Sequence, residues 1–102
     1  MSRRPRALTL SGKEHVVLDL LVSRREMYGL ELVSASRGRL KRGTIYVTLG
    51  RMADKGYVTS VPEDGPPETG GLPRRLYSPT ALGRAVLASW NEARGRLLPR
   101  FA

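Results

Sequence analysis

The residues with the clearest chemical potential lie between Lys41 and Tyr57, in the stretch KRGTIYVTLGRMADKGY. Apolar side chains recur there at the spacing of one buried helix face, at Ile45, Leu49, Met52 and Ala53. The other positions are then expected to point outward, and they include Thr44, Val47, Thr48, Arg51 and Lys55. Such an outer face offers hydrogen bonds and positive charge to an anionic partner.

The whole chain is strongly basic. Its 102 residues hold 18 Lys and Arg against 9 Asp and Glu, for a formal charge of +9. This charge suits a polyanionic partner such as DNA, RNA or an acidic membrane surface, and the alternative is a basic protein with no such partner. The length fits one small domain with a single modest core.

Several classes of protein are disfavoured by the composition. The chain has no cysteine, which excludes disulfides and thiolate metal sites. Its single histidine, His15, has no catalytic partners in the sequence pattern, so we expect no enzyme, no metal and no cofactor. The apolar run Val16 to Leu18 is cut by Asp19, and no segment approaches the roughly 20 apolar residues that span a bilayer. A cytoplasmic protein without membrane partners is expected.

Helices are expected to position the basic stretch. Ser11 and Glu14 have the spacing of a capping box, which starts a first helix ending near Arg24. A second helix is predicted over 28–36, with core candidates Leu30, Leu32 and Val33. Gly38 marks a break, and the basic helix should stop near Gly56, since glycine readily adopts the left-handed conformation at helix ends.

The pattern changes after Gly56. Residues 57–61 alternate as in a strand, the segment PEDGPPETGGLP is too rich in proline and glycine to continue it, and RRLYS is expected to return as the second strand of a hairpin. Thr80 is the expected cap of a last helix ended by Pro99. Its apolar positions follow heptad spacing, at Val86, Trp90, Ala93 and Leu97.

This order predicts a mainly α fold with a small β-hairpin, a winged helix-turn-helix with a C-terminal dimerisation helix. In that geometry the third helix enters the major groove of DNA and the hairpin wing reaches the flanking backbone. Residues 1–79 would form the DNA-binding domain with an N-terminal arm, and residues 80–102 the dimerisation helix, within one compact domain.

Four segments resemble, in order and spacing, the PadR family of bacterial transcriptional regulators. They are LTLSGKEHVVLDLL, MYGLEL, GTIYVTLGRMADKGYVTS and GGLPRRLYSPTALGRAVL, and together they cover roughly residues 8–90. The most specific matches are Gly43 to Tyr46, Leu49, Lys55-Gly56 and the run from Pro73 to Thr80.

The resemblance implies a homodimeric regulator, a repressor, that binds a palindromic operator in double-stranded DNA. The short last helix looks like that of the smaller PadR subclass, in which it pairs with the partner subunit. Trp90 aligns with an aromatic position that stacks flat aromatic effectors in multidrug-sensing members, and a packing tryptophan is the alternative. A protein-interaction module and a general nucleic-acid-binding module remain open, because fold alone does not decide function.

Individual contacts follow from groove chemistry. Arg51 and Lys55 are expected to reach phosphates or guanine, and Thr44, Val47 and Thr48 to touch base edges or a thymine methyl group. Tyr46 is expected at the edge of the buried stripe, with its hydroxyl near a phosphate, and the alternative is a core tyrosine with a solvated hydroxyl. The remaining DNA-binding candidates are Lys41, Arg42, Arg74 and Arg75.

Adjacent strand residues point to opposite faces of a sheet, so only one of Arg74 and Arg75 should face DNA squarely. The carboxylates of Glu63, Asp64 and Glu68 should repel phosphate at the wing tip. The segment containing Arg3, Arg4 and Arg6 is either a DNA-binding arm or a solvated tail.

Overall fold

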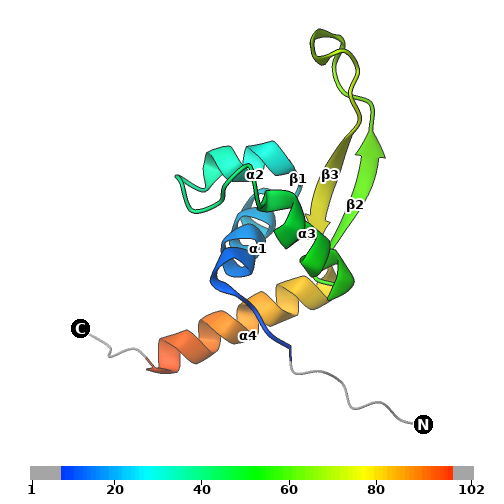
Figure 1. Cartoon of the computed structure of the whole chain (residues 1–102). Coiled ribbons are helices and arrows are strands. Elements are labelled where there is room, and N and C mark those ends of the chain that lie inside the picture. Colours follow the sequence, from blue (N-terminus) through cyan, green and yellow to red (C-terminus); the bar gives the residue numbers. More distant parts are fainter. Residues whose placement is uncertain (1–7, 98–102) are drawn as a thin grey trace.

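The computed structural model describes residues 8–97, without the side chains of Thr69, Arg96 and Leu97. Its helices are α1 (Gly12–Arg24), α2 (Gly29–Ala35), α3 (Ile45–Asp54) and α4 (Ala81–Leu97). Its strands are β1 (Met27–Tyr28), β2 (Val58–Glu63) and β3 (Arg74–Pro79), and a short 3-10 turn, η1 (Pro67–Thr69), lies between β2 and β3. Figure 1 shows the β2–β3 hairpin projecting from the helices as a wing, with α4 at the end of the domain opposite the wing tip. The expected winged helix-turn-helix is confirmed.

Local sequence signals set the helix starts. The Ser11 hydroxyl accepts the Glu14 amide at 3.2 Å, and the Glu14 carboxylate accepts the Ser11 amide at 2.8 Å, so the predicted capping box is present. The Thr80 hydroxyl caps α4 by accepting the Gly83 amide at 3.0 Å. Both caps satisfy amide groups that a helix start leaves without intrahelical partners.

Gly56 ends α3 as expected. It has a φ of 80°, its amide bonds the Ala53 carbonyl, and the Tyr57 amide bonds the Met52 carbonyl at 2.8 Å. This pair of hydrogen bonds is the Schellman motif, which requires a left-handed residue at this position. The chain thereby turns sharply from α3 into β2.

The sheet is larger than the predicted hairpin. Its three antiparallel strands have the order β1-β3-β2, with Met27 opposite Tyr77 and Ser60 also opposite Tyr77. Strand β1 was not predicted, because two residues are too short to show alternation. Strand β2 also continues through Pro62, against expectation. It is an edge strand, where a residue without an amide hydrogen is tolerated.

The core lies between α1, α2, α3, the sheet and the first half of α4. Its fully buried side chains include Leu18, Leu21, Leu32, Ile45, Leu49, Met52 and Tyr57. The predicted burial of two residues is wrong: Leu30 is 46% exposed, and Ala53 is exposed on the outer side of α3. Leu32, Val33 and Ala35 are the apolar side chains that α2 packs against the core.

Candidate nucleic-acid interface

Helix α3 presents a polar outer face that the fold does not use. Ile45, Leu49 and Met52 face the core with at most 1% of their surface exposed. On the other side Thr44, Val47 and Arg51 are exposed, as predicted, and Tyr46 is exposed beside them. Among residues 8–97, the Arg51 guanidinium has no hydrogen bond or ion pair, so its donors are available to a partner.

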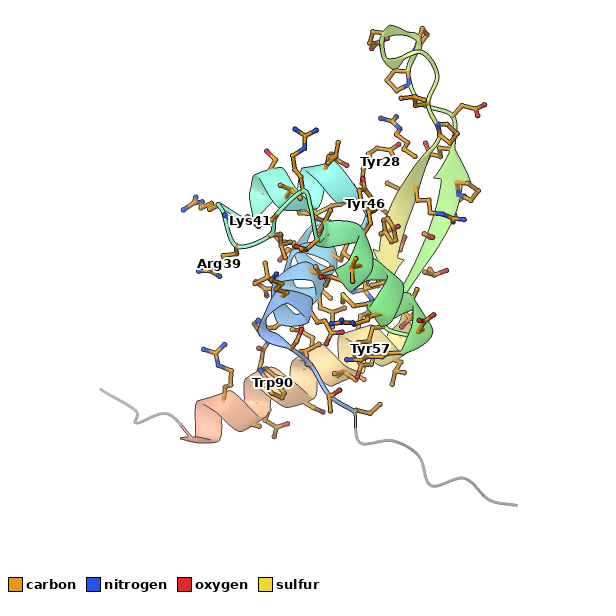
Figure 2. All side chains as sticks on the ribbon, in the orientation of Figure 1. Tyr28, Arg39, Lys41, Tyr46, Tyr57 and Trp90 are labelled. Carbon is orange, nitrogen blue, oxygen red and sulfur yellow. The ribbon has the colours of Figure 1, made fainter. Side chains whose placement is uncertain are left out.

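The turn before α3 extends this face with further cations. Leu40 anchors the turn, because its side chain is buried and its amide donates to the Ser36 hydroxyl at 2.9 Å. Arg39, Lys41 and Arg42 are exposed around this anchor. In Figure 2 the labelled Arg39 and Lys41 lie on the loop between α2 and α3, at the edge of the domain.

The expected outward orientation of Thr48 is wrong. Its side chain is 8% exposed, and its hydroxyl donates to the Thr44 carbonyl at 3.3 Å. A β-branched hydroxyl residue can satisfy its polar group on the preceding helical turn in this way. Thr48 therefore lies on the core side of α3 and does not contribute to the outer face.

Lys55 also departs from the predicted orientation. Its ammonium nitrogen lies 2.9 Å from both carboxylate oxygens of Glu14, at the start of α1, and the Lys55 side chain is one-third exposed. Burial raises the pKa of Glu14, but hydrogen bonds from the Ser11 amide and Lys55, with the charge of Lys55, outweigh burial and hold that pKa below its usual value. Lys55 is thus engaged inside the molecule.

Arg74 lies at the end of the β2–β3 ladder nearest the wing tip, with its guanidinium over the ring of Tyr28, 3.9 Å from the centroid. The Tyr28 hydroxyl donates to the Glu63 carboxylate at 2.8 Å, and this hydrogen bond is the main reason that the pKa of Tyr28 is raised. Glu63 is the cross-strand partner of Arg74. The Arg74 charge is therefore stabilised within the protein by the Tyr28 ring and lies near the Glu63 carboxylate.

Arg75 points to the opposite face of the wing. It shares that face with Tyr77 and Ser60, and its guanidinium donates to the Ser60 hydroxyl at 3.0 Å. Within residues 8–97 its guanidinium hydrogen-bonds only this neutral hydroxyl, and its side chain is exposed. Of the two wing arginines, Arg75 keeps the more available charge.

The acidic residues of the wing are not gathered at its tip. Glu63 belongs to β2 and is held by Tyr28, whereas Asp64 and Glu68 lie in the connection that contains η1. That connection turns back at Gly70 and Gly71, which have φ values of 75° and 71°. Two carboxylates instead of three thus lie beyond the strands.

Tyr46 lies at the junction of α2, α3 and the wing. A Cβ built on Gly29 would meet the Tyr46 ring at 2.6 Å, so the glycine allows the ring to lie against the start of α2. The ring is still 53% exposed and lines a groove of about 460 Å³ with Leu30, Leu72 and Arg75. The predicted position at the edge of the buried stripe is confirmed.

The outer side of α4 carries a second apolar groove. It has a volume of about 210 Å³ and is lined by Leu8, Leu82, Ala85, Val86, Ser89, Trp90 and Ala93. Val86 is only 6% exposed because it packs into the chain's own core, while Trp90 is 41% exposed. The predicted seam is thus divided between the core and the groove; the Leu97 side chain, Pro99 and the arginines of the N-terminal segment fall outside the described residues.

No group of three acidic or histidine residues within 8–97 is arranged to hold a metal ion. None of the helices described is both long and apolar enough to cross a membrane.

The sequence matches the profile of the transcriptional regulator PadR-like family over residues 17–89. No curated protein matches it. A transcriptional regulator from Thermoplasma acidophilum, TA0346, has 27% sequence identity and a TM-score of 0.67, over 81% of this chain and 80% of that one.

Two further solved structures share the fold. A PadR family regulator from Clostridium difficile R20291 has a TM-score of 0.70 and 24% identity, covering 85% of this chain and 91% of that one. Bacillus subtilis PadR, solved in complex with operator DNA, has a TM-score of 0.66 and 22% identity, covering 86% of this chain and 48% of that one.

Proposed function

The chain belongs to the PadR-like family of transcriptional regulators, and from this premise we propose that it binds a specific site on double-stranded DNA as a homodimer. The observation that carries the proposal is the outer face of α3. Thr44, Val47 and Arg51 are exposed there, and within residues 8–97 none of their side chains makes a hydrogen bond to the rest of the fold. The operator-bound structure of the Bacillus subtilis relative supports the same use of the fold.

The chemistry of this face fits the major groove. Arg51 can donate to guanine or to a phosphate, the Val47 side chain can contact a thymine methyl group, and the Thr44 hydroxyl can bond either a base edge or the backbone. Asp54, the acidic residue of α3, lies about 15 Å further along the axis than Thr44 at 1.5 Å per residue. The part of the helix proposed to enter the groove therefore runs from Thr44 to Arg51, ahead of Asp54.

Backbone contacts are assigned to cations around α3. Lys41 and Arg42 precede the helix, and Arg75 lies on the face of the wing that also carries the buried Tyr77. Phosphate contacts of this kind fix the register of a protein on the duplex without reading its sequence. Lys55, which pairs with Glu14, and Thr48, which is buried, are left out of the proposed contact set.

A second copy of the chain is proposed to cover the groove on α4. Trp90, Ala93 and Leu82 offer it apolar surface that the chain's own core leaves exposed. A two-fold dimer would place two α3 helices in successive major grooves about 34 Å apart, so the preferred site should be a dyad. Repression is proposed because the family resemblance points to it, and a reporter gene carrying the recovered site would test it.

Selection of bound fragments from random duplex DNA tests the function. We expect one motif with dyad symmetry and half-site centres about one helical turn apart. Weak binding without a preferred sequence, which collapses as salt is raised, would instead indicate a general nucleic-acid binder. No binding to any fragment would favour a protein-interaction module.

A second candidate function, recognition of a planar aromatic effector, is favoured by the exposed Trp90 in the α4 groove. A flat ligand could stack on the indole ring and would change its surroundings. Trp90 is the only tryptophan of the chain, so its fluorescence reports on this groove alone. Unchanged fluorescence across a broad panel of planar compounds would leave the residue with a packing role.

A further inference from the structure

Lys55 lies immediately after α3, yet its ammonium group points back into the domain. It is within 2.9 Å of both Glu14 carboxylate oxygens, 3.3 Å from the Thr9 hydroxyl and 3.4 Å from the Thr9 carbonyl oxygen. An ammonium has three hydrogens to donate, and four acceptors already surround them. A DNA phosphate could be bound only by giving up contacts within the protein.

The Glu14 carboxylate, which accepts the hydrogen bonds of Lys55, is also held in place. Glu14 is only 2% exposed, and its carboxylate also accepts the Ser11 amide in the capping box of α1. Tyr57 adds a second tie, because its hydroxyl donates to the Thr9 carbonyl at 2.7 Å. Lys55 and Tyr57, on either side of the turn between α3 and β2, thus hold the segment that enters α1.

This network joins parts of the chain that are 41 residues apart, Lys55 and Glu14. It connects the C-terminal end of α3, the start of the wing and the N-terminal end of α1. Side-chain tips on a helix lie about 5–6 Å from its axis, so a rotation of about 20° would displace them by about 2 Å. A displacement of that size is enough to break a hydrogen bond to a base.

We propose that Lys55 is a positioning residue and not a DNA contact: through its ion pair with the buried Glu14 it sets the orientation in which α3 presents Arg51 and its neighbours. The proposal rests on the proposed DNA-binding function. It differs from a phosphate contact in two measurable respects, the salt dependence of binding and the effect of changing Glu14, which is too buried to touch DNA.

The first test measures the affinity for the selected duplex over a series of salt concentrations. Wild type, Lys55→Met, Glu14→Gln and the double variant are compared, with the folded fraction of each checked by circular dichroism at the assay temperature. We expect each single variant to bind about tenfold more weakly, the double variant to bind no more weakly than either single, and all salt slopes to match that of wild type.

A phosphate contact predicts a different pattern. Lys55→Met would then lower the slope of log affinity against log salt by about 0.9, while Glu14→Gln would bind at least as tightly as wild type because it frees the cation. That result would overturn the proposal. If Lys55→Met does not fold, Lys55→Gln, which retains a donor, replaces it in the same comparison.

The second test needs no DNA. The chain has no cysteine, so spin labels can be placed at exposed Ser23 on α1 and exposed Ala53 on α3 through cysteine substitutions. We expect the distance distribution between the labels to shift or broaden in Lys55→Met. An unchanged distribution in Lys55→Met would refute the positioning role. If the distribution shifts in Lys55→Met but the wild-type protein binds no duplex, only the DNA-binding function is refuted.

Discussion

The substitution Gly83→Ala tests how α4 is seated on the rest of the domain. A Cβ at Gly83 would lie 2.2 Å from the Tyr57 carbonyl oxygen and 3.1 Å from the Leu18 side chain. The carbonyl cannot retreat freely, because it accepts a hydrogen bond from the Thr80 amide at 3.0 Å. The first turn of α4 must therefore move away from the α3–β2 corner.

The expected loss of stability can be worked out from these contacts. Overpacking costs about 1–3 kcal/mol, and the upper end applies because the closest neighbour is backbone. Alanine in a helix recovers about 1 kcal/mol relative to glycine, which leaves a net loss of about 2 kcal/mol. Since roughly 1 kcal/mol shifts the Tm of a domain of this size by about 4–8 °C, the variant should melt about 8–16 °C lower.

Thermal and urea unfolding followed by circular dichroism measure the effect, and Gly50→Ala is the matched control. A Cβ at Gly50, in α3, meets no atom within 4 Å, so Gly50→Ala should raise the free energy of unfolding by about 0.5–1 kcal/mol. The two variants should therefore shift in opposite directions. A Gly83→Ala protein as stable as wild type would refute the close packing of α4.

Three further outcomes are expected. The pKa of Glu14 is lowered in the folded state, so the ionised carboxylate stabilises the fold at pH values above its ordinary pKa of 4.5, and this stabilisation is lost as the pH falls below that value. Glu14→Gln should therefore flatten the acid side of a plot of unfolding free energy against pH, measured by urea melts. Arg75→Ala should lower the salt slope of DNA binding by about 0.9, whereas Arg74→Ala should leave that slope unchanged; equal slopes for both would contradict the assignment. Gly29→Ala should cost less than about 1 kcal/mol, since the Tyr46 ring can swing outward, yet weaken operator binding in an anisotropy titration.

Signals that act over a few residues were readable from the sequence. The Ser11 and Glu14 pair, the glycine at position 56 and the Thr80 cap are each completed by groups three or four residues away. They place the helix ends and the turn into the wing. For the same reason the exposure of Thr44, Val47 and Arg51 followed from the spacing of the buried stripe alone.

Features that depend on distant parts of the chain were not readable. The pairing of Lys55 with Glu14 exists only because α3 ends beside the start of α1, and a lysine after a helix otherwise suggests a solvated cation. Thr48 was expected to point outward because it is polar. It lies three residues after the buried Ile45, however, and this spacing places it on the inner face of the helix. Leu30 was expected inside because α2 is too short for its spacing to separate an inner from an outer side.

The central claim is that the exposed flank of α3 contacts duplex DNA, and Arg51 tests it most directly. Arg51→Ala is compared with Arg84→Ala, which removes an equally charged, exposed arginine from α4 on a side away from the apolar groove. Their affinities for the selected duplex are measured at one salt concentration, together with their melting temperatures. Arg51→Ala should bind at least tenfold more weakly than Arg84→Ala and melt at the same temperature, because a good base contact is worth about 1–3 kcal/mol. Equal affinities for the two variants would contradict the central claim.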